Sequence, residues 1–272
     1  MQPSAITGDP TACPIVVKIG GSTLGSHDTT LKDLISLQKE GYKLVVIHGG
    51  GKVITQWMER QGIRPKFIRG LRVTDALSLD IATAVLTGLV NKQLVASLTT
   101  MGGRALGLSG VDGGLLQCDL ADPELGYVGQ VTKVDPTPVE QALKGGYIPF
   151  VAPIGIHNND GSDKAGCLLN INGDTVAGEI AYNLHASWLI FLTDVEGVMD
   201  SSGRTVSRLN PRQARMFIRS GIANGGMIPK LEACLKALPQ VPMANIIDGR
   251  KAGALRRCVQ GEVTGTRLFG GG

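Results

Sequence analysis

Two glycine clusters, each at the end of an apolar run, constrain the fold of this chain more than any other feature. The apolar run at residues 14–19 ends in Lys18-Ile19-Gly20-Gly21, and the run at 44–47 ends in His48-Gly49-Gly50-Gly51. Short apolar runs bounded by turn residues are typical of strands buried in a parallel sheet. Two such strands bring two glycine-rich turns to one edge of the sheet, where open α/β sheets bind ligands.

These glycine turns suit a phosphate group. A backbone without Cβ atoms can approach the ligand closely and offer N–H groups, and a helix N-terminus behind the turn adds a favourable dipole. Lys18 adds a full positive charge at the first turn. Either cluster alone is equally compatible with a tight strand-to-helix turn, whereas the pair favours an anion site.

Strand and helix signals alternate along the chain, which predicts a three-layer αβα sandwich with a mainly parallel sheet. Apolar periodicity, caps and glycine stops predict helices at residues 30–40, 50–61, 75–87 (capped by Thr74), 88–101, 138–144, 174–184, 211–219, 228–238 and 251–259. Strands are expected at 14–19, 44–47, 105–109, 115–118, 127–134, 148–156, 188–193, 244–247 and 264–269, and the segments 115–118 and 127–134 are expected to form a hairpin.

Composition excludes several classes of protein. A length of 272 residues allows one large α/β domain or two lobes, and a net charge of +4 with 4% aromatic residues does not suggest nucleic-acid binding. The chain has no run of 18 apolar residues, and residues 1–12 lack the basic start and apolar core of a signal peptide. We therefore expect a cytoplasmic protein with a disordered tail at residues 1–13 and no contact with a membrane. The 5 scattered cysteines and 4 histidines lack metal-ligand spacing, which indicates reduced thiols and no protein-held metal.

Three further segments carry candidate site residues, although the chain lacks a Walker A loop and a dinucleotide fingerprint. Arg72 in GLRVTD can form a bidentate pair with a carboxylate. Asn170, Asn172 and Asp174 open a helix and lie on one side if the segment is extended. Lys230 in GGMIPK begins a helix, where the dipole disfavours a cation unless an anion binds there. Each also fits an ordinary role: a surface arginine, an N-cap at Asp174, a solvated lysine.

Taken together, these segments resemble the amino acid kinase family, and within it the acetylglutamate kinases. The resemblance runs from about residue 14 to residue 269 and rests on VVKIGGS, VVIHGGG, GLRVTD, VNKQLV, GLSGVDGG, ELGYVGQV, NINGDTVAGEIA, LTDVEGVMD and GGMIPKLEAC. It implies an αβα sandwich around an eight-stranded, mainly parallel sheet. It also implies an N-terminal lobe at 14–165, which binds the acyl amino acid and forms the dimer, and a C-terminal lobe at 166–272, which binds ATP.

The activity that the resemblance implies is transfer of the γ-phosphoryl group of ATP to the side-chain carboxylate of N-acetyl-L-glutamate, the second step of arginine biosynthesis. The product is an acyl phosphate. A carboxylate with an ordinary pKa of about 4.3 is already ionised at neutral pH, so the nucleophile needs no general base. The difficulty is to bring two anions together and to stabilise charge on the moving phosphoryl oxygens.

The resemblance also implies catalytic roles for four residues. Lys18 and Lys230 would stabilise the transition state from two sides, and Asp174 would hold both lysines in place. The backbone N–H of Gly21 would donate to the phosphoryl oxygens.

Substrate-binding roles follow in the same way. Gly50 and Gly51 would offer N–H groups to the phosphoryl oxygens and the substrate, Arg72 would bind the α-carboxylate, and Asn170 would bind the substrate with support from Asn172. Mg2+ would be carried on the ATP phosphates. The residues implied for the nucleotide are Asp194, Val195, Glu196, Gly197, Val198, Met199, Ile222, Ala223 and Asn224.

The chain departs from the family pattern at three places. Gly173 stands where the family commonly has alanine. About thirteen residues precede the first strand, too few for the long helix that joins dimers into hexamers in arginine-inhibited members, and residues 254–258 (ALRRC) lack the glutamate expected beside an arginine site. We therefore expect an arginine-insensitive homodimer, and the sequence does not indicate whether a PII-type regulator binds.

Three other functions remain to be weighed. A kinase of the same fold that acts on carrier-protein-linked aminoadipate or glutamate would need basic residues after GLSG, and residues 113–119 contain none. A catalytically silent ligand sensor would not need Lys18, Asp174 and Lys230 together. A redox dinucleotide-binding protein has only the glycines in its favour.

Overall fold

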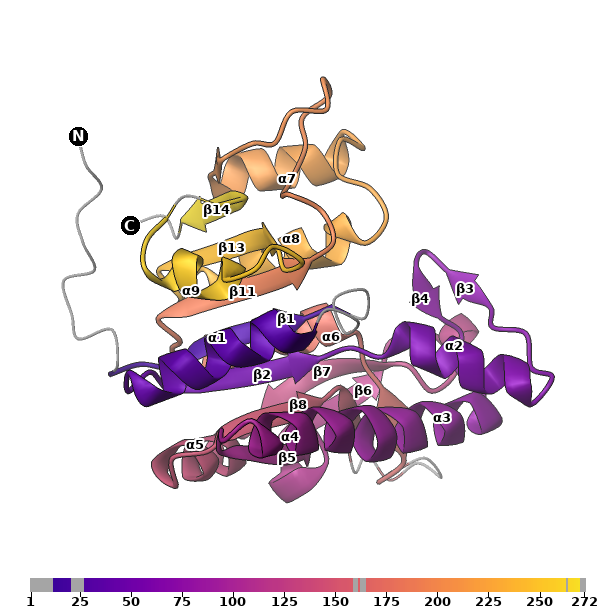
Figure 1. Ribbon diagram of the computed structural model, residues 1–272. Helices are drawn as coiled ribbons and strands as arrows, with labels where there is room; N and C mark the ends of the chain where they lie inside the picture. The colour runs from indigo at the N-terminus through magenta and orange to yellow at the C-terminus, as the bar shows by residue number, and fades with distance from the viewer. Residues whose placement is uncertain (1–11, 21–26, 159–160, 162–164, 263, 270–272) are drawn as a thin grey trace.

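The structure is a computed structural model, and it describes residues 12–20, 27–158, 161, 165–262 and 264–269. Within them an eight-stranded sheet has the order β12-β14-β13-β11-β1-β2-β8-β5. Strand β1 (Ile15–Ile19) lies near its centre and pairs in parallel with β2 (Leu44–His48) and β11 (Trp188–Thr193) (Figure 1). Only β13 and β14 pair antiparallel in this sheet. The predicted fold class, an αβα sandwich with a mainly parallel eight-stranded sheet, is confirmed.

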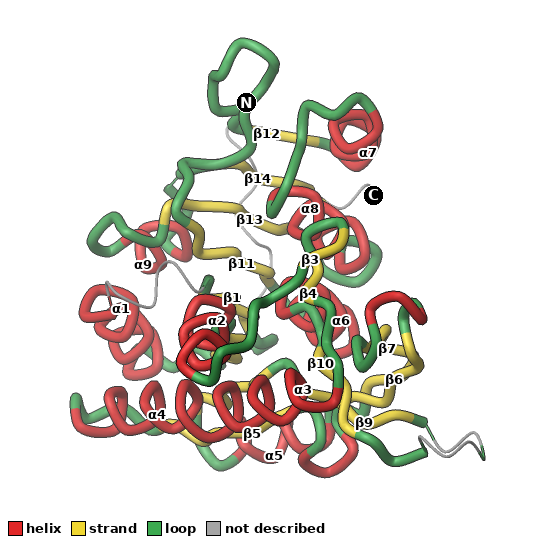
Figure 2. The backbone as a smooth tube through the Cα atoms, turned by 90° about the vertical axis from the view of Figure 1, so that its right-hand side faces the viewer, coloured by secondary structure: helices red, strands yellow, loops and turns green. Residues whose placement is uncertain are grey.

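Helices cover both faces of this sheet (Figure 2). One face carries α1 (His27–Lys39), α2 (Gly51–Arg60), α9 (Ala254–Val259) and one continuous helix made of α3 (Ala76–Thr83), the π-helical η1 (Ala84–Val90) and α4 (Asn91–Thr100). The other face carries α5 (Thr137–Lys144), α6 (Gly173–Asn183), α7 (Pro211–Arg219) and α8 (Met227–Ala237). The remaining strands of the sheet are β5 (Ala105–Ser109), β8 (Ile148–Ala152), β12 (Arg208–Leu209), β13 (Met243–Asp248) and β14 (Thr266–Phe269).

A second, four-stranded sheet has the order β10-β9-β6-β7. Its strands are β6 (Leu116–Leu120), β7 (Gly129–Val134), β9 (Ile154–His157) and β10 (Leu168–Asn170), and the predicted hairpin is confirmed as β6–β7. The single strand predicted at 148–156 is wrong, because the chain leaves the large sheet after β8 and enters the small one at β9. Pro153 lies at the break, where its missing N–H cannot serve a ladder.

A two-stranded hairpin, β3 (Phe67–Ile68) and β4 (Leu71–Arg72), was not predicted, because two-residue strands carry no periodic pattern. The predicted cap at Thr74 is also wrong. Asp75 is the N-cap of α3, and its carboxylate accepts the Ser78 N–H at 2.8 Å. The helix at Ala76–Thr100 is long and apolar enough to cross a membrane by length and composition, and 44% of its most apolar window is buried in the fold.

Side-chain alternation decides which face of the sheet each site residue meets. Val16 packs in the core on the α6 side, whereas Val17 packs on the α1 side. Lys18 therefore faces α6 at the C-terminal end of β1. On β2, Val46 packs on the opposite side from α6, so His48 faces the long helix that contains η1. The two neighbouring strand ends thus present Lys18 and His48 to opposite layers.

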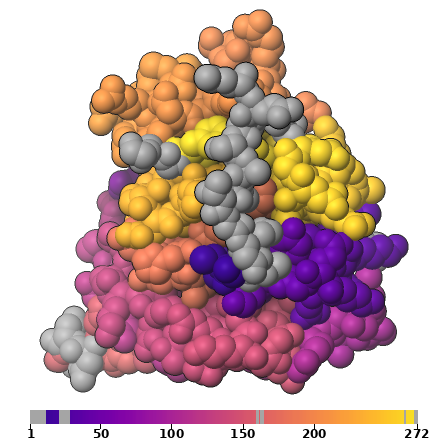
Figure 3. All heavy atoms as spheres, turned by 90° about the vertical axis from the view of Figure 1, so that its left-hand side faces the viewer, coloured from indigo at the N-terminus to yellow at the C-terminus, as the bar shows by residue number. Residues whose placement is uncertain are grey.

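Figure 3 shows the side of the molecule that lies on the left in Figure 1, with the indigo-to-magenta first half of the chain below the orange and yellow last third. The division into lobes at residues 165 and 166 stays a prediction. Strand β10, which follows that boundary, pairs with β9, which precedes it. Of the predicted tail, residues 1–11 lie outside the described residues.

Candidate active site

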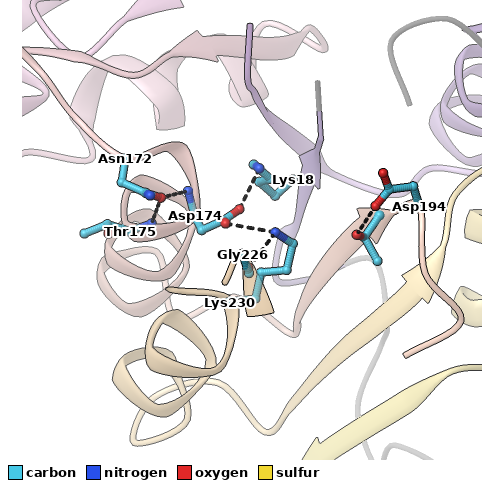
Figure 4. A network of polar contacts seen from close by, with 8 residues as sticks. Lys18, Asn172, Asp174, Thr175, Asp194, Gly226 and Lys230 are labelled. Carbon is cyan, nitrogen blue, oxygen red and sulfur yellow. Dashed lines mark hydrogen bonds and ion pairs between the residues drawn. The ribbon is translucent and has the colours of Figure 1, made fainter. Parts of the chain in front are cut away.

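A buried lysine and a largely buried one meet a buried carboxylate at the C-terminal edge of the large sheet (Figure 4). Lys18 Nζ lies 2.6 Å from Asp174 Oδ1, and Lys230 Nζ lies 3.1 Å from Asp174 Oδ2. Lys230 Nζ also donates to the Gly226 carbonyl at 3.1 Å. The three charged side chains are only 10%, 7% and 13% exposed for Lys18, Asp174 and Lys230. The fold thus joins β1, α6 and α8 in one cluster, as expected for these three residues.

The N-terminus of α6 positions Asp174. Asn172 is the N-cap, and its side-chain oxygen accepts the N–H groups of Asp174 at 2.8 Å and Thr175 at 3.3 Å. The alternative of Asp174 as the N-cap is therefore wrong, and the segment is not extended throughout, since α6 begins at Gly173. A carboxylate in the first turn is favoured by the helix dipole.

Burial and charge act against each other on these groups. Burial by itself would raise the pKa of Asp174, but the ammonium groups of Lys18 and Lys230 outweigh it and hold that pKa below its usual value. Burial lowers the pKa of Lys18, an effect that Asp174 partly offsets and the charge of Lys230 reinforces. With all three groups ionised, the cluster has one positive charge in excess. A positive excess shielded from water attracts a further anion more strongly than an exposed one does.

On the α8 side, the cluster borders a cavity of about 360 Å³ at the end of β11. Lys230, Gly226 and Thr193 line it, together with eight of the nine residues implied for the nucleotide. Thr193 donates its hydroxyl proton to Asp194 Oδ1 at 3.3 Å. Glu196 is the exception, because it pairs with Lys251 Nζ at 2.8 Å and lines a neighbouring cavity. Nucleotide binding by the eight residues stays a prediction.

On the α2 side lies a second cavity, of about 180 Å³. All five residues implied for the substrate line it: Gly50, Gly51, Arg72, Asn170 and Asn172. Gly21, the remaining residue implied for the site, lies outside the described residues. Sequence reasoning missed the apolar part of the wall, which includes Ile54, Phe67, Leu86 and Val128. A residue in this group carries no polar signal, and only the packing of α2, β3, η1 and the segment before β7 identifies it.

Arg72 is the charged group of this second cavity. It lies on β4, and its Nη2 donates to Gly51 O at 3.0 Å and to Thr55 Oγ1 at 2.8 Å. Its guanidinium carbon stacks 4.8 Å from the centre of the Phe67 ring. These contacts hold the guanidinium at the start of α2, and they exclude the surface arginine considered above, since Arg72 is only 8% exposed.

Asn170 joins the same wall from the small sheet. Its Nδ2 donates to Thr74 Oγ1 at 3.2 Å, and the Thr74 hydroxyl donates to the Arg72 carbonyl at 3.0 Å.

Among the described residues, no group of three or more His, Cys, Asp or Glu side chains lies close enough together to hold a metal ion.

The chain that carries this lysine–aspartate–lysine cluster is similar to known proteins. The family model described as "Amino acid kinase family" matches residues 14–243. The chain belongs to the amino acid kinase family. The relatives reported below are similar to this chain over most of their length, so the shared fold includes the whole of the described site.

Two curated relatives of this chain are named acetylglutamate kinase. The protein from Dehalococcoides mccartyi is 42% identical over 256 residues, which cover 94% of each chain. The protein from Synechococcus elongatus is 43% identical over 249 residues, which cover 89% of this chain and 81% of that one. Among solved structures, smu.665 from Streptococcus mutans superposes with a TM-score of 0.82 at 30% identity, over 94% of this chain and 98% of that one.

Proposed function

We propose that this protein transfers the γ-phosphoryl group of ATP to the side-chain carboxylate of N-acetyl-L-glutamate. The observation that carries the proposal is the buried Lys18–Asp174–Lys230 cluster, which borders a cavity on the α8 side and lies beside another on the α2 side. Relatives named acetylglutamate kinase, at 42–43% identity over most of their length, support the choice of substrate.

In this mechanism Asp174 is an orienting group and not a base. Both of its oxygens are engaged by ammonium groups, and the acceptor carboxylate is already ionised at neutral pH. Lys18 reaches the transferred group from the β1 side and Lys230 from the α8 side. Because charge develops on the phosphoryl oxygens in the transition state, two prepositioned ammonium groups stabilise it without reorganising.

The second cavity would hold the acyl amino acid. Arg72 would pair with its α-carboxylate, and Asn170 would bind its polar groups with Asn172 in support. Gly50 and Gly51 lie at the N-terminus of α2, whose first N–H groups have no partner within the helix and suit an anion. A cavity of about 180 Å³ suits a free small molecule.

The first cavity would hold ATP, with its phosphates toward Lys230 and the start of α8. We propose that Mg2+ arrives on those phosphates, which supply most of its oxygen ligands and whose charge it partly neutralises. We also propose a cytoplasmic, arginine-insensitive homodimer. Light scattering that finds hexamers would contradict the oligomeric part of the proposal.

The test is turnover by the purified protein with ATP, Mg2+ and N-acetyl-L-glutamate, with the acyl phosphate trapped as its hydroxamate. Glutamate and aminoadipate derivatives run in parallel, with and without arginine. We expect hydroxamate from N-acetyl-L-glutamate, unaffected by arginine, and a loss of several orders of magnitude in Lys230→Ala. Folded protein that binds ATP but yields no hydroxamate from N-acetyl-L-glutamate would overturn the proposal.

A further inference from the structure

His48 is a fully buried polar residue that the charge cluster does not explain. It ends β2 with 0% of its surface exposed, one residue before the glycine turn. Because side chains alternate along β2, its ring lies on the side of η1 and α4, away from Asp174. Its two ring nitrogens therefore need partners from that layer or from the turn itself.

Asn91, the first residue of α4, supplies one of those partners. Its Nδ2 donates to the Phe150 carbonyl at 2.8 Å and the Leu108 carbonyl at 3.2 Å, and its Oδ1 accepts from Lys92 Nζ at 3.0 Å. These contacts assign the orientation of the amide. The same Nδ2 lies 3.1 Å from His48 Nε2. An amide NH2 group donates and cannot accept, so this ring nitrogen is the acceptor, and it shares the two amide protons with the two carbonyls.

The proton of the neutral ring is consequently on Nδ1. Nδ1 lies 3.1 Å from the Gly49 carbonyl oxygen, to which it donates. Burial, together with the charges of Lys18 and Lys92, lowers the pKa of His48 to about 4, despite the Gly49 hydrogen bond. The ring is thus neutral at neutral pH, as the hydrogen bonds require.

Holding the Gly49 carbonyl also orients the Gly50 N–H, because the two groups belong to one peptide unit and point in opposite directions across a trans bond. With the carbonyl turned to the ring, the N–H points away from it. The η1 segment packs closely against this turn, since a Cβ on Gly50 would lie 2.7 Å from Leu86 Cδ2 and 3.5 Å from Val90 Cγ2. π-Helical segments are rare and occur frequently at functional sites.

We propose that His48 is a positioning residue. Asn91 selects the tautomer with the proton on Nδ1, and the Nδ1–H then orients the turn so that the Gly50 N–H points toward the site of phosphoryl transfer. This inference rests on the proposed function and adds to it a residue that touches neither substrate. It predicts that the Nδ1 donor matters for the rate, whereas the bulk and polarity of the ring matter less.

Two amide variants separate these properties. In His48→Asn the side-chain nitrogen takes roughly the place of Nδ1, and in His48→Gln it takes roughly the place of Nε2. Losing one transition-state donor costs about 100-fold to 1000-fold, and a misdirected donor costs less, so we expect kcat of His48→Gln to fall about 10-fold to 100-fold. We expect His48→Asn to stay within about threefold of the wild type, and the KM for ATP to change little in both variants.

His157 offers a matched control. It ends β9, is 5% exposed, and its Nδ1 lies 2.8 Å from the carbonyl of the next residue, Asn158, yet it lines neither cavity. His157→Gln should therefore keep the wild-type kcat. Thermal melting of all three variants shows that the rates compare folded proteins.

Nitrogen-15 NMR of the His48 ring gives a readout that does not depend on turnover. We expect a protonated Nδ1 and an unprotonated Nε2 near pH 7, and an altered tautomer ratio in Asn91→Ala. A ring protonated on Nε2, or a kcat for His48→Gln at or above that of His48→Asn, would overturn the inference. If the wild type forms no acyl phosphate, the proposed function fails by itself, and the NMR result alone then decides whether His48 holds Gly49.

Discussion

The crossing of α6 and α8 sets the distance between Asp174 and Lys230, and Gly178 makes that crossing possible. Asp174 and Gly178 lie one turn apart on α6, and Lys230 and Ala233 lie about one turn apart on α8. A Cβ added at Gly178 would lie 2.7 Å from the Ala233 carbonyl oxygen and 3.0 Å from its Cα, whereas ordinary contacts begin at 3.4 Å. Since these atoms belong to the backbone, α8 must move in Gly178→Ala.

The size of the effect follows from this geometry. The helices must separate by about 0.5–1 Å, which stretches the 3.1 Å contact of Lys230 with Asp174 by a similar amount. A misplacement of about 1 Å costs on the order of 100-fold in rate, so we expect kcat to fall about 10-fold to 100-fold with little change in either KM. Overpacking costs about 1–3 kcal/mol, and the helix propensity of alanine returns about 1 kcal/mol, so the variant should remain folded.

The assay is the hydroxamate measurement together with a thermal melt. Gly88→Ala is the matched control, because Gly88 also lies within a helix but a Cβ there would meet nothing within 4 Å. It should leave kcat unchanged. A wild-type kcat for Gly178→Ala, or an equal loss in Gly88→Ala, would refute the argument that this crossing sets the cluster.

Three other outcomes are expected. Arg72→Lys keeps the charge but loses the donors to Gly51 and Thr55, so the KM for the acyl amino acid should rise about tenfold or more while the KM for ATP stays constant. An equal rise in both KM values would contradict the assigned site. Asp174→Asn leaves two largely buried ammonium groups without their counter-ion, so urea unfolding should show a loss of about 3–5 kcal/mol in the free energy of unfolding. An unchanged urea midpoint would contradict this expectation. Burial lowers the pKa of Lys18 from 10.5, and its ammonium loses its proton as the pH rises through that lowered value, so kcat should already decline below pH 10.5. A kcat that stays constant up to that pH would refute the role of the charge.

Most strands and helices could be predicted because their signals are local. The apolar runs of β1 and β2, the glycine stops and the Asn210-Pro211 helix start are all patterns within a few residues. The same holds for the choice of Lys18 and Lys230, which stand out as charges beside glycine turns. The β3–β4 hairpin and the break at Pro153 were not predicted, since hairpin strands of two residues and a change of sheet depend on distant partners.

The sequence by itself determined the fold class and the residue types that phosphoryl transfer needs, because periodicity, turn residues and charge are properties of neighbouring positions. The tertiary structure decided which groups meet. The strand order β11-β1-β2 and the close crossing at Gly178 bring both lysines to Asp174, and the fold also places Lys251 beside Glu196. The tertiary structure also decided the contact of Asn91 with His48. These residues lie far apart in the chain, and no local pattern encodes how the helix that carries Asn91 packs on the strand that carries His48.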